Sequence, residues 1–139
     1  MLERKITKQL LEWKNSKNKM SLVVKGARQV GKTYIIRKFC EENYENFIEI
    51  NFDEQPEYKD IFNRNLDVET IIKRITATVE NVNLVPYKTV IFLDEIQNCP
   101  NARTALKFLT LDDRFDVISS RFITWNKCKK STFVSSRAR

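Results

Sequence analysis

The sequence predicts an α/β fold in which helices cover both faces of a parallel β-sheet. Short runs rich in β-branched and aromatic residues alternate along the chain with segments of helical period. The run TVIFL, residues 89–93, is also continuously apolar, as expected of a strand covered on both faces. Strands separated by helices imply parallel β-α-β units and a three-layer sandwich.

The first half of the chain predicts two helices and two strands. An amphipathic helix is expected within residues 1–19, because apolar residues recur there at positions i, i+4, i+8 and i+11: Leu2, Ile6, Leu10 and Trp13. SLVVK, residues 21–25, is a short strand that leads into a segment containing glycine. Residues 32–42 follow as a helix, and the alternating FIEINF, residues 47–52, follows as a strand.

The second half repeats the alternation. Asp67 can cap a helix whose apolar face consists of Val68, Ile71, Ile72, Ile75 and Val79. After the strand at 89–93, Pro100 suits the first turn of a short helix. FDVIS, residues 115–119, is the fourth predicted strand.

Composition sets the limits for function. A chain of 139 residues with 42% hydrophobic residues suits a single folded domain, and no apolar run approaches the ~20 residues that span a bilayer. Three widely spaced cysteines and no histidine argue against a structural zinc site and favour reduced thiols. The first twenty residues show no secretory signal, so we expect a cytoplasmic protein.

The net charge of +7 is concentrated at the two ends of the chain. Residues 121–139 hold six basic residues and no acidic one, and residues 1–20 hold six basic and two acidic residues, whereas the stretch between them is mildly acidic. A basic tail is more often solvated than used to read nucleic acid, so nucleic-acid binding is the weaker interpretation.

The two glycines of the chain, Gly26 and Gly31, lie in one motif. Residues 26–33, GARQVGKT, match G-x-x-x-x-G-K-[ST] between a predicted strand and a predicted helix. Glycine permits the dihedrals that turn backbone N–H groups toward a phosphate at a helix N-terminus. Lys32 can reach the β- and γ-phosphates, and the Thr33 hydroxyl can ligate Mg²⁺. The motif predicts a nucleotide-phosphate site.

A second motif follows the buried strand, where Asp94 and Glu95 come directly after TVIFL. Ligands bind at the carboxyl ends of parallel strands. Asp94 can therefore hold Mg²⁺, and Glu95 can polarise the attacking water. The alternative is that the pair only solvates a loop, and the complete glycine motif makes that alternative the weaker one.

Three segments together resemble a known family: KGARQVGKTYII, INFDEQPE and VIFLDEIQNCPNARTALKFL. They look like the AAA-type P-loop ATPase domain (AAA+ superfamily) of bacterial and archaeal ATPases whose chains continue into a further C-terminal domain. The resemblance covers about residues 2–120. It implies a P-loop NTPase fold, ATP and Mg²⁺ as cofactors, and FDVIS inserted between the two motif strands.

The resemblance also implies roles for individual residues. Its Walker A loop would comprise Gly26, Ala27, Arg28, Gln29, Val30, Gly31, Lys32 and Thr33, with Tyr34 following. Its Walker B strand would end in Asp94, which assists Mg²⁺, and Glu95, the catalytic glutamate. Ser119 or Ser120, with Ser120 preferred, would sense the γ-phosphate. An arginine finger would come from a neighbouring domain or another copy in an oligomer.

The resemblance stops after residue 120. We divide the chain into a helix at 1–19, a core at 20–120 and a basic tail at 121–139, expected to be disordered or non-native. Without the family's fifth strand and helical lid, the strand at 21–25 should lie at the sheet edge. Besides an ATPase, a small-molecule P-loop kinase and a basic nucleic-acid-binding module remain as alternatives.

Overall fold

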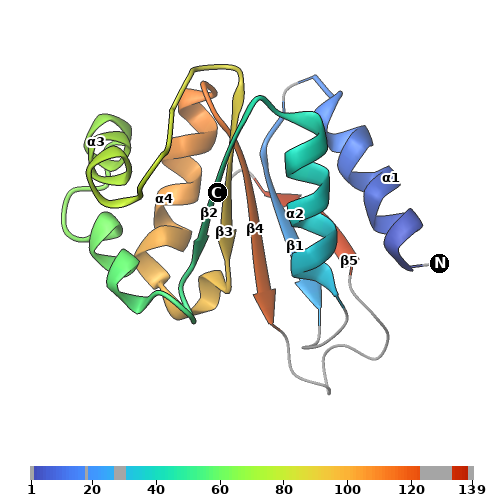
Figure 1. Cartoon of the computed structure of the whole chain (residues 1–139), viewed down its shortest axis with the longest axis horizontal. Helices are drawn as coiled ribbons and strands as arrows, with labels where there is room; N and C mark the ends of the chain where they lie inside the picture. The colour runs from blue at the N-terminus through green and yellow to red at the C-terminus, as the bar shows by residue number, and fades with distance from the viewer. Residues whose placement is uncertain (1, 18, 27–30, 123–132, 138–139) are drawn as a thin grey trace.

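A computed structural model describes residues 2–17, 19–26, 31–122 and 133–137. It contains a five-stranded sheet between two layers of helix (Figure 1). The strands are β1 (Ser21–Gly26), β2 (Asn46–Asn51), β3 (Thr89–Asp94), β4 (Asp116–Phe122) and β5 (Phe133–Arg137). The helices are α1 (Leu2–Lys14), α2 (Lys32–Asn43), α3 (Val68–Thr78) and α4 (Pro100–Asp112), with 3₁₀ turns η1 (Pro56–Phe62) and η2 (Ile96–Asn98). The predicted α/β architecture is confirmed.

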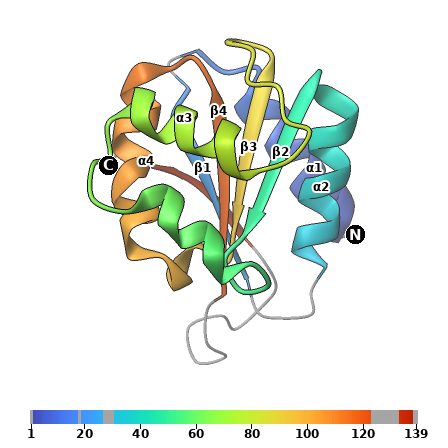
Figure 2. The same ribbon diagram turned by 60° about the vertical axis from the view of Figure 1, so that its left-hand side comes forward.

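Two hydrophobic cores lie on opposite faces of the sheet. Helices α1 and α2 cover one face, and α3 and α4 cover the other (Figures 1 and 2). Strand β3 serves both cores, because Ile91 and Leu93 point into one and Val90 and Phe92 into the other. This alternation explains the continuous apolar run of β3. Of the helices that the structure describes, none is both long and apolar enough to cross a membrane.

Local signals at Asp67 and Pro100 begin α3 and α4 as predicted, whereas α1 ends at Lys14 rather than at residue 19. The Asp67 carboxylate accepts a hydrogen bond from the backbone N–H of Thr70 at 3.1 Å, which caps α3. Pro100 occupies the first turn of α4, where its missing N–H has no intrahelical acceptor to lose. Ile6, Leu10 and Trp13 are buried along α1 against the sheet, as its helical spacing predicts.

The strand order is β2-β3-β4-β1-β5, and the first four strands are parallel. Strand β4 therefore lies between β1 and β3, as the family resemblance implies. Leu93 pairs with Ser119 and Val24 with Ser120, so the carboxyl ends of these strands meet at one edge of the sheet, the lower edge in Figure 1.

The prediction that β1 forms the sheet edge is wrong. Strand β5 pairs with it antiparallel over five residues, with Val23 opposite Ser135. The unpaired N–H and C=O groups of an edge strand can form hydrogen bonds with any short extended segment. The segment FVSSR is too short for its sequence to show the alternation of a strand. Strand β4 also continues to Phe122, past the predicted boundary at residue 120. The remaining tail, 123–132 and 138–139, lies outside the described residues.

Candidate functional site

Polar side chains from four elements meet at the carboxyl edge of the sheet. Asp94 ends β3 and is fully buried. One of its carboxylate oxygens, Oδ2, accepts hydrogen bonds from Thr33 Oγ1 on α2 at 2.9 Å and from Asn51 Nδ2 on β2 at 3.2 Å. The other, Oδ1, accepts one from the Ser120 hydroxyl on β4. Asp94 is thus the centre of a hydrogen-bonded cluster of neutral donors.

Among the described residues, the Asp94 carboxylate has no ion-paired cation. Neutral donors stabilise a buried carboxylate but leave a net negative charge, which is costly in a low dielectric. The site therefore favours an added cation beside Asp94.

Lys32 and Glu95 form a second, adjacent pair. The Lys32 ammonium nitrogen lies 3.8 Å from Glu95 Oε2, and the two side chains are only 5% and 11% exposed. Glu95 adopts a left-handed backbone conformation, with φ 59° and ψ 48°, and its N–H donates to Ser120 Oγ at 3.2 Å. A non-glycine residue in this region is strained, and such strain is found preferentially at functional sites.

Helix α2 begins at this edge with backbone donors that no described side chain caps. Gly31 precedes it with φ 78° and ψ 15°. A Cβ at Gly31 would meet no atom within 4 Å, so glycine is required here for its backbone conformation rather than for space. The free N–H groups and the helix dipole suit an anion at this point.

The structure separates the predicted residues into groups. It brings together Lys32, Thr33, Asp94, Glu95 and Ser120. Gly26 ends β1 and, unlike Gly31, has no positive φ. The side chain of Tyr34 is 59% exposed on α2, away from the buried cluster. Ala27, Arg28, Gln29 and Val30 lie outside the described residues.

Of the two candidate sensor serines, only Ser120 faces the cluster. Its hydroxyl bridges Asp94 and the backbone of Glu95. The hydroxyl of Ser119 instead donates to the carbonyl of Leu22 on β1 at 3.4 Å. Alternation along β4 points the two side chains to opposite faces.

Sequence reasoning assigned no role to Asn51 and Gln97, which also belong to the cluster. Besides Asp94, Asn51 contacts the next turn, where its Oδ1 accepts from the N–H groups of Asp53 and Glu54 at 2.8 and 2.9 Å. Gln97 donates to Glu95 Oε1 at 2.8 Å. The available signal was positional: Asn51 ends a parallel strand, and Gln97 follows two residues after the Asp-Glu pair.

The donor set fits Mg²⁺ bound together with phosphate. Carboxylate and hydroxyl oxygens from Asp94 and Thr33 lie side by side. Within the described part of the chain, no group of three or more His, Cys, Asp or Glu side chains could form a metal cage. Mg²⁺ is commonly held by one or two carboxylates plus substrate phosphates, so the residues present are those expected for a metal that enters with a nucleotide.

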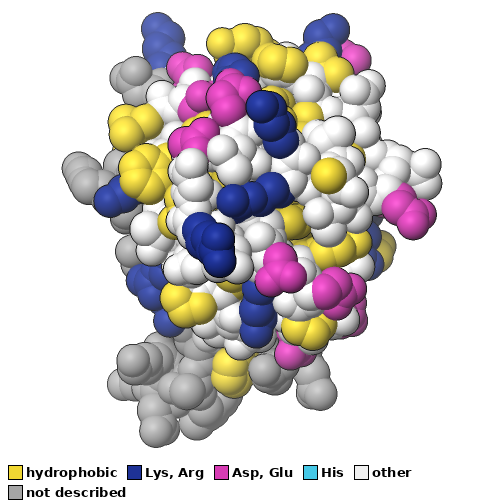
Figure 3. Space-filling view, turned by 90° about the vertical axis from the view of Figure 1, so that its left-hand side faces the viewer, with side chains coloured by type: hydrophobic (Ala, Val, Ile, Leu, Met, Phe, Trp, Pro, Cys, Tyr) yellow, Lys and Arg dark blue, Asp and Glu magenta, His cyan; other side chains and the backbone are white. Residues whose placement is uncertain are grey.

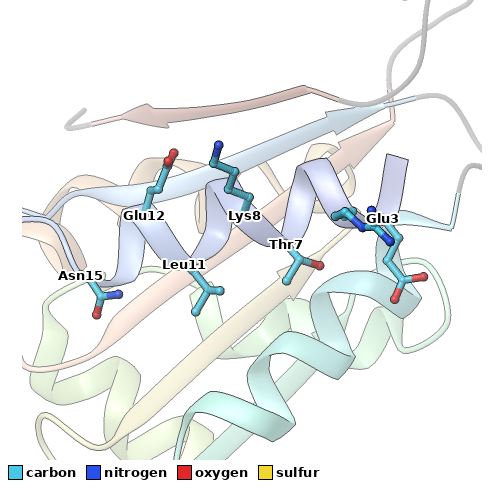
Figure 4. A pocket seen from close by; sticks show the side chains of 7 residues that line it. Glu3, Thr7, Lys8, Leu11, Glu12 and Asn15 are labelled. Carbon is cyan, nitrogen blue, oxygen red and sulfur yellow. The ribbon is translucent and has the colours of Figure 1, made fainter. Parts of the chain in front are cut away.

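A surface groove lies away from this cluster. It is open, with a volume of about 860 Å³, and follows helix α1 (Figure 4). Leu11, 39% exposed, lies near its middle, and Lys8 and Glu12 carry opposite charges beside it. These side chains do not converge on a point, so the described lining of the groove lacks the focused polar groups of a specific ligand site.

Comparisons with known proteins agree with the fold. A family model described as an AAA domain matches residues 18–124. A search of curated protein sequences gives no match. Among solved structures, C. elegans PCH-2 has a similar fold, with a TM-score of 0.51 at 15% sequence identity. The likeness covers 88% of this chain and 37% of that chain, so this chain spans well under half the length of PCH-2.

Proposed function

This chain belongs to the AAA domain family, whose function is of the nucleotide-binding ATPase type, and we propose that it binds Mg·ATP at the carboxyl edge of its sheet and hydrolyses it slowly. The observation that carries the proposal is the environment of Asp94. Its fully buried carboxylate has three neutral donors, and none of the described lysines and arginines pairs with it. A divalent cation supplies the missing charge.

The phosphates would lie between Lys32 and the first turn of α2. Gly31 turns the chain into the helix, and the uncapped N–H groups there are suited to phosphate oxygens. The Lys32 ammonium adds a point charge within the same buried region. Thr33 and Asp94 would hold Mg²⁺, which when bound neutralises the terminal phosphates and polarises the bond to be broken.

Hydrolysis requires a base near the terminal phosphate, and Glu95 is the candidate. Its carboxylate lies beside Lys32, so a phosphate bound by Lys32 would be close to it. In this position Glu95 would accept the proton of an attacking water as its oxygen bonds to the γ-phosphorus and the bond to the bridging oxygen breaks, which releases ADP. Ser120, bonded to both Asp94 and Glu95, holds the two acidic residues in register.

We expect slow turnover from the 139-residue chain alone. Charge on the transferred phosphoryl group must be neutralised in the transition state, and an arginine finger contributes about 10³–10⁵ in rate in P-loop enzymes. We propose that such an arginine comes from a neighbouring domain or a second copy of the chain. Binding should therefore be readily measured, and hydrolysis should need a sensitive assay.

Replacing the base tests this assignment. Glu95→Gln keeps the shape of the side chain and removes its basicity, so the Kd for Mg·ATP should change less than about threefold. Single-turnover release of radiolabelled phosphate should fall by roughly 10²–10⁴, the contribution of a general base. Glu42→Gln, on the exposed side of α2, is the matched control and should hydrolyse ATP like the wild type. Unchanged turnover in Glu95→Gln would contradict the assignment.

The same assay tests the two alternative functions. The face formed by α3 and α4 carries both basic and acidic side chains (Figure 3). We therefore expect added nucleic acid to leave phosphate release unchanged. Transfer of radiolabel to a small hydroxyl or amine compound instead of water would identify a kinase.

A further inference from the structure

Gln97 connects the end of β4 to the carboxylate of Glu95. Its side-chain nitrogen Nε2 donates to Glu95 Oε1 at 2.8 Å. Its side-chain oxygen Oε1 accepts from the backbone N–H of Phe122 at 3.2 Å. The same amide group therefore donates a hydrogen bond to the candidate base and accepts one from the strand that carries Ser120.

The two carboxylate oxygens of Glu95 have different partners. Oε1 is held by Gln97, and Oε2 lies 3.8 Å from Lys32 Nζ. In the proposed function, Lys32 turns to the β- and γ-phosphates when nucleotide binds, so its hold on Glu95 weakens. The amide of Gln97 is neutral, so the phosphates do not draw it away from Glu95 as they draw the Lys32 ammonium. It is thus the contact that can persist through the reaction.

We propose that Gln97 is a positioning residue that aims the Glu95 carboxylate at the attacking water and fixes it relative to the end of β4. The inference rests on the proposed function, because it assigns Gln97 a role through Glu95. One oxygen of the carboxylate is occupied by the amide, and this leaves the other to accept the water proton. A general base must be held within hydrogen-bond reach of that proton to be effective.

Glutamine is suited to this position because it offers both a donor and an acceptor on one planar group. Glutamate at position 97 would keep an acceptor for Phe122 and lose the donor to Glu95. Methionine has nearly the same length and loses both hydrogen bonds. The pair Gln97→Glu and Gln97→Met therefore separates the two contacts.

The first experiment measures single-turnover hydrolysis and Mg·ATP affinity. Gln97→Met should reduce the hydrolysis rate about 10- to 100-fold and change the Kd for Mg·ATP less than about threefold. When combined with Glu95→Gln, it should reduce the rate by less than about twofold more, because its effect passes through Glu95. Asn98→Ala, in the same 3₁₀ turn, is the control and should retain the wild-type rate.

The outcomes distinguish the two levels of inference. If Glu95→Gln has no effect on the rate, the proposed function fails. If Glu95→Gln abolishes hydrolysis but Gln97→Met leaves the rate unchanged, the positioning role alone is wrong. Full additivity of the two substitutions would likewise overturn it, since a purely structural residue lowers the rate independently of Glu95.

A second experiment does not depend on ATP hydrolysis. Amide hydrogen exchange measured by NMR should be at least tenfold faster at Phe122 in Gln97→Met than in the wild type, because the acceptor is lost. Gln97→Glu keeps an acceptor and should exchange within about threefold of the wild type at Phe122. Unchanged exchange at Phe122 in Gln97→Met would show that the link to β4 is absent and would overturn the proposal.

Discussion

The two ends of the sheet each hold an aspartate, and the two aspartates are treated differently. At the amino end, Asp116 begins β4 and forms an ion pair with Lys19, whose Nζ lies 2.8 Å from Oδ2. The Tyr44 hydroxyl donates to the same oxygen. At the carboxyl end, Asp94 is more deeply buried, yet its described partners are neutral hydroxyl and amide groups.

The difference teaches how to tell structural from functional polar groups in one sheet. Asp116 has its counter-charge within the protein, so its interactions stabilise the fold and leave little charge for a ligand. Asp94 has hydrogen bonds but forms no ion pair with a described lysine or arginine, and in the proposed function Mg²⁺ would supply the counter-charge. Backbone strain does not separate the two ends, because positive φ occurs at Glu95 beside Asp94 and also at Tyr87 and Asp113, which line the same cavity as Asp116.

The largest expected effect at the carboxyl end comes from Lys32→Ala. Removing the buried ammonium leaves the phosphates balanced only by backbone dipoles and metal, so the affinity for Mg·ATP should fall at least about 100-fold. Isothermal titration calorimetry and nucleotide-dependent thermal stabilisation measure this directly.

Lys38→Ala provides the matched control for Lys32→Ala. Lys38 lies on the same helix, but its side chain is 47% exposed and pairs with Glu3 on α1. Loss of an exposed ion pair costs little, so nucleotide affinity should remain within about twofold of the wild type. Undiminished ATP-dependent stabilisation in Lys32→Ala would contradict the phosphate-site assignment.

A paired substitution tests the comparison between the aspartates. Asp116→Asn removes the charge that pairs with Lys19 and should lower the free energy of unfolding by about 1–3 kcal/mol without changing nucleotide affinity. Asp94→Asn removes a buried charge that lacks a described cation, so the unfolding free energy should change by less than about 1 kcal/mol. Stabilisation by Mg·ATP should be lost in Asp94→Asn alone.

Chemical denaturation with and without Mg·ATP gives both quantities for the two variants. If Asp94→Asn destabilised the nucleotide-free protein as strongly as Asp116→Asn, Asp94 would be a structural residue. The difference between the two ends of the sheet would then have no functional meaning.

Much of the fold could be predicted from the sequence because the signals were local. The apolar run of residues 89–93 indicated strand β3, and the capping residue Asp67 indicated the start of helix α3. The predicted cluster of Lys32, Thr33 and Asp94 followed from one topological rule, the meeting of parallel strand ends. Strand β5 was missed, because its pairing depends on an available edge of β1 rather than on a pattern of its own.

Asn51 and Gln97 were missed for a related reason. A polar residue at the end of a strand or just after it is also common where an ordinary loop begins, so its type and place do not reveal its partner. Their roles come from contacts between elements, namely β2 with β3 for Asn51 and η2 with β4 for Gln97. Such contacts depend on register, which a single sequence does not report.

The smallest expected effect concerns pH and belongs to the amino end. Burial first, and then the hydrogen bond to Asp116, raise the pKa of Tyr44 well above its ordinary value near 10. Above pH 10 the unfolded chain loses the phenolic proton while the folded chain keeps it, so stability falls as the pH rises, by at most about 1.4 kcal/mol per pH unit. Tyr44→Phe should reduce this slope in urea titrations between pH 9 and pH 11, whereas the exposed Tyr87→Phe should not. An unchanged slope in Tyr44→Phe would show that the phenol does not remain protonated in the folded protein. Asp116 would then lack the hydrogen bond from Tyr44 on which its comparison with Asp94 relies.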